Sequence, residues 1–415
     1  MKNEALFITE YFHDRPGLSL WLSILLALIL LGGFSLLASL VTSMEILEFS
    51  LKVSWAGLIA TYIFLVTSGS GLCIINALGS VFGMQGYEMM TRRAVFLSII
   101  TIVFGMFCIL LHLGRPERLP IYNLLSPNFR SAISWMGMLY TIYLAVVAVE
   151  FWLLNRKWLI EKAERAGYKG KAILNILALK KLDDTFMGKI FNNHELLRIL
   201  GALAFISGAS ALSMLGSVFA HTESRVMWYG PYYPIFFLVS AIFCGYALLL
   251  ATMIITYRVQ REAMPPVLKI QIFEMAKVLA IILIAGFFMI FYRLFTAFYD
   301  PLLRDSAILL INGPFSFAFW FFEVGLMIAA PVFVLAWAAW GKNINGVLAG
   351  SLSVLIGGYV MRYVFVVAGQ VYPNIPEGLP TYLPTPMEVL LISGVFGILL
   401  MVYTFGEILL DLKET

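Results

Sequence analysis

Residues 92–118 read RRAVFLSIITIVFGMFCILLHLGRPER, and this stretch shows the pattern that decides the fold. Residues 94–111 hold no charged side chain, and such a run is close to the roughly 20 residues that a helix needs to cross the hydrocarbon of a bilayer. The run ends at His112, and Arg115, Glu117 and Arg118 follow at once. Long apolar runs that alternate with short charged connections predict a chain of membrane-spanning helices.

The composition of the whole chain extends this prediction. Of 415 residues, 61% are hydrophobic and only 13% are charged, and the mean hydropathy is +0.90. A soluble domain carries about a quarter charged residues, so we expect an all-α integral membrane protein that forms a single polytopic domain over residues 1–415. The net charge of +4 does not indicate nucleic-acid binding, because the positions of Lys and Arg matter more than their sum in a membrane protein.

Ten apolar runs are long enough to cross a membrane. Their approximate bounds are 18–43, 54–82, 92–113, 132–155, 197–221, 231–257, 270–298, 315–340, 346–371 and 388–411. The sizeable polar segment, 156–195, is basic and is predicted to form interfacial helices within a loop. No small-residue cleavage site follows the first run, so we expect no cleavable signal peptide.

The distribution of basic residues predicts the orientation. With ten spans, both termini and the even-numbered connections lie on one side, and this side carries 19 of the 28 Lys and Arg residues. The opposite side carries six, and the remaining three, Lys277, Arg293 and Arg362, lie within spans. The positive-inside rule therefore puts both termini and the basic loop 156–195 in the cytoplasm, with residues 112–130 on the outer face.

Several charged and polar side chains are predicted at similar depth in the outer half of the membrane. Glu323 lies a turn or two inside the eighth span, Arg293 is near the outer end of the seventh, and Arg362 lies well inside the ninth. His112 and His221 end the third and fifth spans on the same side. A single charge within a membrane is costly, so such groups usually pair with one another or line a polar cavity.

Simpler explanations remain open for most of these groups. Charged residues such as those at 115–118 also serve as interfacial anchors, and His112 and His221 also fit helix ends. An ion pair between Glu323 and an arginine would equally well lock helices together. Arg362 is harder to explain in this way, because it is far from either end of its span.

Longer motifs carry further information. HLGRPER at 112–118 is followed by SPNFRSAISWMGMLYTIYLAVVAVEFW, and later spans read FWFFEVGLMIAAPVFVL, RYVFVVAGQ and PTPMEVLLISGVFGILL. Together with SWAGLIATYIFLVTSGSGLC near the second span, these motifs resemble the polysulfide reductase NrfD family of membrane subunits, and its ten-helix members in particular. The resemblance covers roughly residues 50–410, with HLGRPER as its most specific part. The basic segment 156–195 matches no family feature.

The resemblance implies two four-helix bundles with an extra helix pair, in the cytoplasmic membrane of a prokaryote. It implies a subunit of a respiratory complex that binds menaquinone or another quinone near one membrane face. An iron–sulfur, ferredoxin-like subunit would dock on that face and connect it with further catalytic or cytochrome subunits. It also implies no haem, iron–sulfur cluster or metal in the chain itself. The three cysteines are consistent with this expectation, because they lie within apolar runs and lack the spacing of ferredoxin cluster ligands.

Quinone chemistry explains why these residue types would be needed. His112 and Glu323 are candidate proton exchangers, because an imidazole or a partly buried carboxyl group can exchange protons near neutral pH. Arginines stabilise negative charge on a quinone oxygen without losing a proton. The predicted quinone-binding residues are Arg115, Glu117, Arg118, Arg362 and His221, the last on its depth alone.

A second set of charged residues lies toward the cytoplasmic side and sketches a proton route across the membrane. Its members are Glu150, Glu274, Lys277 and Glu407. Ordinary interfacial charge, with an ion pair on the helix surface between Glu274 and Lys277, is the simpler interpretation.

Two other classes of protein remain as alternatives. A b-type cytochrome needs histidines on facing helices, and only His112 and His221 lie near spans, both at the outer end. A secondary transporter would also explain charges within the membrane, but matching broken helices in an inverted repeat are not evident.

Overall fold

The computed structural model describes residues 15–41, 53–113, 115–165, 168–183, 185–191, 194–371, 384–410 and 412. Within these residues the secondary structure is helical, and ten helices are long and apolar enough to cross a membrane. The prediction of an all-α integral membrane protein with ten spans is therefore confirmed. The predicted ends of the first span at 42–43 and of the last at 411, and parts of 156–195, lie outside the described residues.

The long helices follow the predicted runs closely. They are α2 (Pro16–Val41), α3 (Gly57–Ser80), α5 (Thr91–His112), α7 (Ala132–Arg165), α10 (His194–Ala220), α11 (Tyr232–Gln260), α12 (Pro266–Tyr299), η4 (Ala318–Ala329) continued by α14 (Ala330–Trp340), α15 (Ile344–Val371) and α16 (Pro386–Leu409). Helix α7 runs ten residues beyond its predicted end at 155, because its last turns are polar and a helix can continue past the bilayer.

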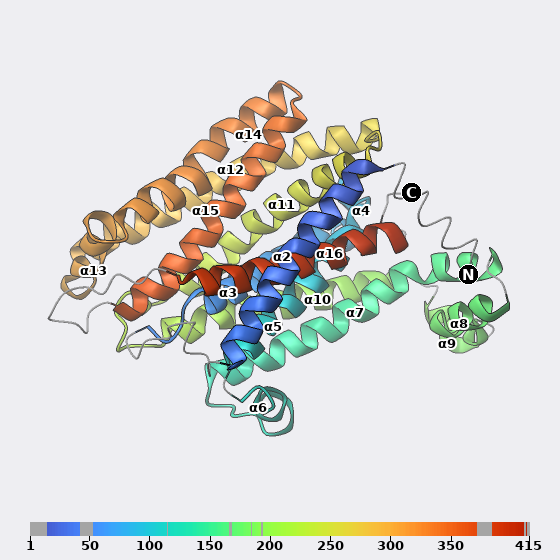
Figure 1. Ribbon diagram of the computed structural model, residues 1–415, viewed down its shortest axis with the longest axis horizontal. Coiled ribbons are helices and arrows are strands. Elements are labelled where there is room, and N and C mark those ends of the chain that lie inside the picture. The colour runs from blue at the N-terminus through green and yellow to red at the C-terminus, as the bar shows by residue number, and fades with distance from the viewer. Residues whose placement is uncertain are drawn as a thin grey trace.

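Short helices lie at both ends of the bundle. One end, named here the α13 end, carries α6 (Arg118–Pro120), η2 (Ile121–Leu125) and α13 (Pro301–Asn312). The opposite end, named the α8 end, carries α4 (Gln85–Glu88), α8 (Tyr168–Leu177), η3 (Lys180–Leu182) and α9 (Phe186–Phe191) (Figure 1). In terms of the predicted orientation, the α13 end is the outer one.

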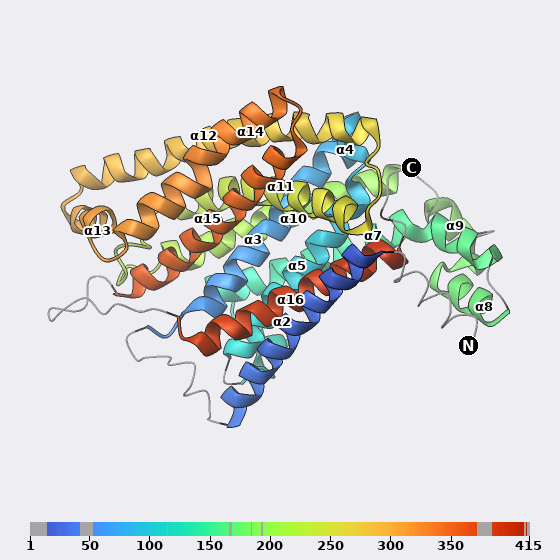
Figure 2. The same ribbon diagram turned by 45° about the horizontal axis from the view of Figure 1, so that its top comes forward.

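The helices form two rings of four consecutive spans. In the first bundle α3, α5, α7 and α10 pack in a ring, and in the second α11, α12, η4–α14 and α15 do the same. The pair α2–α16 packs on the first bundle through α5 and α3 (Figure 2). This arrangement agrees with two four-helix bundles and an extra helix pair.

The two bundles meet where α3 crosses α11. A Cβ atom on Gly71 would lie 1.9 Å from the carbonyl oxygen of Ala241, so only glycine fits at this crossing. Small residues at a crossing let two membrane helices approach closely and gain van der Waals contact. The first helix of each bundle thus forms the central contact of the molecule.

The basic segment after α7 folds back on that helix. The indole nitrogen of Trp152 donates to the carbonyl of Leu177 at 2.8 Å, and Arg156 Nε donates to the carbonyl of Ala178 at 3.0 Å. Arg156 also forms an ion pair with Asp183. Short helices were predicted in this segment, and these contacts attach them to the α8 end of α7.

Candidate functional site

Three charged side chains from different helices meet near the α13 end of the second bundle. Glu323 lies on η4, Arg362 on α15 and Arg293 on α12, and all three line one small cavity with Tyr233 and Phe236 of α11. Glu323 is 4% exposed and Arg362 is 1% exposed. Charges buried so deeply in a membrane protein usually face a partner or a polar cavity, so this cavity is the first candidate site.

The helix that carries Glu323 has an unusual geometry. Residues Ala318–Ala329 form a π-helix, which continues as the ordinary helix α14. π-helical turns are rare and often occur at functional sites. Gly357 of α15 makes room for this turn, because a Cβ atom there would lie 2.5 Å from the backbone nitrogen of Met327. The wide turn and the glycine together bring η4 close to α15, the helix that carries Arg362.

Arg362 has only part of its hydrogen-bonding capacity satisfied. Its Nη2 donates to the hydroxyl of Ser240, and its guanidinium lies 4.1 Å from the centroid of the Phe237 ring. Its Nε and Nη1 are buried without a hydrogen-bond partner among the described residues. A guanidinium has five N–H donors, so Arg362 retains donors at the cavity that it lines.

Among the residues that the structure describes, no ion pair neutralises these three charges. None of the ion pairs formed by the described residues includes Glu323, Arg293 or Arg362. Arg293 instead lies over two aromatic rings, 5.5 Å from the centroid of Tyr232 and 5.0 Å from that of Tyr233. The arrangement therefore differs from the simple interhelical ion pair that was the alternative for Glu323.

A larger cavity adjoins this cluster and shares Arg293, Met227 and Tyr233 with it. Its volume is about 430 Å³, within the range of small-molecule sites. The walls come from α11, α12, α13 and residues 226–231, and they are mostly apolar and aromatic. The two cavities together offer a mostly apolar chamber lined by the guanidinium of Arg293, with the guanidinium of Arg362 and the carboxyl group of Glu323 in the adjoining smaller cavity. An aromatic ring with polar oxygens at its edge fits such a chamber.

The predicted loop residues lie elsewhere. Arg115, Glu117 and Arg118 are exposed, on and before α6, and they line neither cavity. His112 is half-buried at the last position of α5 in the first bundle, and it also lines neither cavity. His221 is exposed, and its Nδ1 lies 2.7 Å from the carbonyl oxygen of Ser217 on its own helix. The structure thus brings together Glu323 and Arg362, with Arg293, and keeps the loop and the histidines outside this cluster.

The predicted proton-route residues fall into two groups. Glu150 is buried and accepts a hydrogen bond from Asn76 at 2.9 Å. Glu407 is also buried. Glu274 and Lys277, in contrast, form an ion pair of 2.7 Å with each other on the exposed surface of α12. This second pair matches the simpler interpretation of a helix-surface ion pair.

Two buried charged residues, Arg93 of α5 and Glu388 of α16, were not among the residues singled out from the sequence. Arg93, at the start of the predicted third span, is fully buried, and its Nε lies 2.8 Å from Glu407 Oε1. Glu388 is fully buried and accepts a hydrogen bond from the backbone nitrogen of Gly57 at 2.6 Å. The pattern Thr385-x-x-Glu388 matches a helix capping box and predicts the start of α16, but it does not predict that Glu388 is buried. For Arg93, next to Arg92 at a helix start, the sequence holds no signal that predicts burial.

Comparison with known proteins now adds an independent finding. Residues 45–374 match the family model described as polysulphide reductase, NrfD. The chain belongs to the NrfD family. This result confirms the family predicted from HLGRPER and the later motifs.

Curated relatives of this NrfD-family protein are subunits of oxidoreductases. It is 24% identical over 401 residues to a selenate reductase subunit of Mesobacillus selenatarsenatis, covering 93% of the chain and 92% of the relative. It is 24% identical to the Hdr-like menaquinol oxidoreductase integral membrane subunit of Archaeoglobus fulgidus, covering 86% and 84%. It is 28% identical to a putative dimethyl sulfoxide reductase membrane subunit of Halobacterium salinarum, covering 49% and 44%. The chain is thus similar over most of its length to membrane subunits of reductase complexes.

Proposed function

We propose that this NrfD-family protein is the quinone-reactive membrane subunit of an oxidoreductase complex. The observation that carries the proposal is Arg362, which is 1% exposed, keeps two nitrogens without a partner among the described residues, and lines a cavity with Glu323. The relative from Archaeoglobus fulgidus is named as a menaquinol oxidoreductase subunit, which supports menaquinone or a similar quinone as the ligand.

The two adjoining cavities fit a quinone ring. The chamber of about 430 Å³ would hold the ring against Tyr232, Tyr292 and Arg293, and the smaller cavity would admit one ring oxygen toward Arg362. When bound, the quinone would accept two electrons and two protons, and the quinol would release them. Arg293 and Arg362 would stabilise negative charge at that oxygen, since arginine keeps its own proton. Glu323 would deliver or accept the proton, because its carboxyl group lines the same cavity and has no ion-pair partner among the described residues.

Electrons would pass to or from an iron–sulfur subunit at the α13 end. The relatives are named as subunits of selenate and dimethyl sulfoxide reductases, so further subunits of an oxidoreductase are expected partners. Arg115, Glu117 and Arg118 project from an exposed loop at this end. We assign them to the docking surface for that subunit rather than to the quinone cavity.

Substitutions at the cavity test the proposal in the assembled complex. Arg362→Gln should weaken binding of a quinone analogue by roughly tenfold or more, since a hydrogen bond to a charged group contributes about 1.5–3 kcal/mol. Glu323→Gln should lower quinone-linked turnover by at least about 100-fold, the usual size of a lost acid–base group. Binding is measured by titration with the analogue and turnover by steady-state kinetics.

Two controls separate the cavity from other positions. Lys277→Gln lies in an exposed ion pair on α12 and should leave both quantities unchanged. His112→Ala should have little effect, because His112 lines neither cavity. If the Arg362 and Glu323 variants bind the analogue and turn over like the unmodified complex, the proposed site is wrong.

We further propose that quinone turnover moves protons through the buried groups at Glu150 and Glu407. Glu150 contacts Asn76, and Glu407 accepts from the hydroxyl of Tyr403 at 2.7 Å, so each carboxyl group sits in a buried polar cluster. In proteoliposomes that hold the complex and a trapped pH indicator, Glu150→Gln should reduce the pH change per quinone turned over. Glu274→Gln, at the surface of α12, is the matched control. The absence of any pH change in the unmodified complex would exclude this second proposal.

A further inference from the structure

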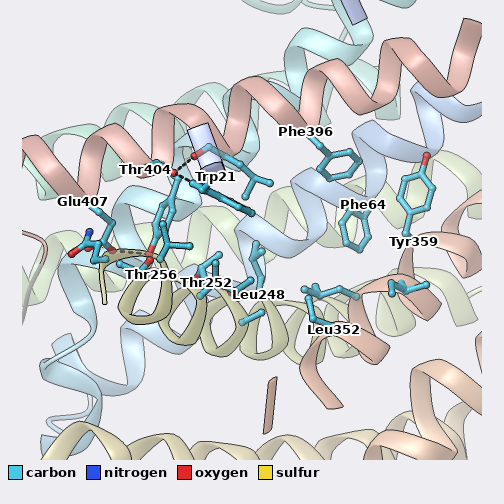
Figure 3. Close-up of a pocket in the computed structure, with 18 of the residues that line it drawn as sticks. Trp21, Phe64, Leu248, Thr252, Thr256, Leu352, Tyr359, Phe396, Thr404 and Glu407 are labelled. Carbon is cyan, nitrogen blue, oxygen red and sulfur yellow. Dashed lines mark hydrogen bonds between the residues drawn. The ribbon is translucent and has the colours of Figure 1, made fainter. Parts of the chain in front are cut away.

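A second large cavity, which shares no lining residue with the charged cluster, lies between the α2–α16 pair and the second bundle. It has a volume of about 470 Å³, and its walls come chiefly from α2, α11, α15 and α16. We name it the slot. Figure 3 shows Phe64, Tyr359 and Phe396 at one end of the slot and Thr256 and Glu407 at the other. Most of the remaining wall is aliphatic, with Leu248, Leu352 and Leu400 among its residues.

The slot exists because α2 packs closely against α16 but makes few contacts with the second bundle. Helix α2 packs extensively on α16 and slightly on α11. Trp21 of α2 donates to the hydroxyl of Thr404 on α16 at 3.0 Å, which fixes the indole at the wall of the slot. The opposite wall is α15, whose Leu352 and Ile356 are exposed. An apolar space between membrane helices is filled most readily by a hydrocarbon chain, since most of the side chains that line it offer water no hydrogen bond.

A polar cavity of about 490 Å³ continues the slot at the α8 end. Gln260 and Glu407 line both cavities, so the two are contiguous. The polar cavity is also lined by Lys162, Arg165 and Trp158 of α7. The ammonium group of Lys162 lies 4.3 Å from the centroid of the Trp158 ring. Tryptophan and basic residues at the end of a span are typical of the level at which lipid headgroups lie.

The charges of the polar cavity favour an anion. Two of its carboxylates are compensated within the protein, because Glu262 pairs with Arg15 at 3.4 Å and Glu407 pairs with Arg93 at 2.8 Å. Among the described residues that line this cavity, Lys162 and Arg165 then face one further carboxylate, that of Glu161. Basic groups at the membrane surface attract anionic lipids.

We propose that the slot and the polar cavity together bind one anionic phospholipid of the surrounding bilayer. Its phosphate lies between Lys162 and Arg165 beside Trp158, and one acyl chain runs along the slot past Leu352 toward Phe64 and Tyr359. The lipid fills the gap between α2 and α15 and so joins the α2–α16 pair to the second bundle. This site is independent of the quinone cavity at the α13 end.

The test uses the full-length protein, purified in mild detergent, delipidated, and mixed with equal amounts of phosphatidylglycerol and phosphatidylcholine. Native mass spectrometry counts the lipids retained. The unmodified protein should retain one phosphatidylglycerol in preference to phosphatidylcholine. The double variant Lys162→Gln, Arg165→Gln should lower this preference by roughly tenfold or more. Leu352→Trp, which fills the slot, should abolish retention of the tightly bound lipid while leaving the headgroup residues intact.

Matched controls separate the site from general surface effects. Lys180→Gln removes a lysine at the same end that pairs with Glu164 at 3.2 Å, outside both cavities, and should keep the preference. Ile281→Trp enlarges an exposed side chain of α12 that lines neither cavity, and should keep the retained lipid. Equal retention of the two lipids by the unmodified protein would overturn the proposal. So would unchanged retention in the Leu352→Trp variant, or displacement of the lipid by a quinone.

Discussion

A guanidinium inside a membrane protein has to be stabilised by its surroundings, and Arg362 obtains part of that stabilisation from Ser240 and the Phe237 ring. Arg93 obtains all of its contacts from protein groups, since it pairs with Glu407 and lies 5.3 Å from the centroid of the Tyr257 ring. The two arginines are equally buried, but only Arg362 has guanidinium nitrogens without a hydrogen-bond partner among the described residues. We therefore propose that Arg362 binds a ligand and that Arg93, through its ion pair, stabilises the fold.

The Arg93–Glu407 pair yields a stability prediction at this scale. Glu407→Gln should lower the free energy of unfolding by about 3–5 kcal/mol, because it leaves a buried guanidinium without its counter-charge. The double variant Arg93→Met, Glu407→Leu should recover most of this loss, since similar apolar side chains can replace a buried pair. Unfolding in mixed detergent and SDS measures both. Equal losses in the single and double variants would mean that the pair itself is not the cause.

Sequence reasoning reached Glu323 and Arg362 because a charge in the middle of an apolar run is conspicuous. It did not reach Arg93 or Glu388, which sit where a span begins and look like ordinary interfacial residues. Burial at such positions depends on which helices pack together there, and α16 takes part in both contacts. Those contacts are tertiary, and one sequence alone carries no trace of them.

At the scale of elements, hydropathy predicts the ten spans well, because each must cover the same hydrocarbon thickness. It does not predict the π-helix η4 or the helix α13 in the preceding connection. A change from α to π hydrogen bonding leaves the apolar pattern almost unaltered. Yet these two elements line the candidate site, so its shape is the part that sequence predicts least.

The contact between η4 and α15 can be tested through one glycine. Gly357→Ala places a Cβ atom 2.5 Å from the nitrogen of Met327 and 2.6 Å from the carbonyl oxygen of Phe322, so η4 must move away from α15. We expect a loss of about 1–3 kcal/mol in unfolding free energy, the usual size for overpacking, together with weaker binding of a quinone analogue. Gly33→Ala on α2 is the matched control, because no atom lies within 4 Å of the position that its Cβ would take. Unchanged analogue binding in Gly357→Ala would show that the π-helical turn does not shape the site.

At the scale of the whole molecule, the two ends of the bundle differ in the charges that they expose. The α13 end carries the proposed quinone cavity and the exposed loop with Arg115 and Arg118, and the α8 end carries the basic helices that fold back on α7. The excess of Lys and Arg at the α8 end predicts that this end is cytoplasmic. The α13 end would then meet its electron-carrying partner on the outer face.

Orientation and docking can be read from the same pair of engineered cysteines. Arg118→Cys should react with a membrane-impermeant maleimide in intact cells, and Lys180→Cys should react only after permeabilisation. The native Cys73, Cys108 and Cys244 are buried and should not react under either condition.

In the assembled complex Arg118→Cys should react several-fold more slowly than in the isolated subunit, because the partner covers the loop. Lys180→Cys, at the opposite end, should react equally in both. Labelling of Lys180→Cys in intact cells would reverse the orientation, and equal reactivity of Arg118→Cys with and without the partner would remove this loop from the docking surface.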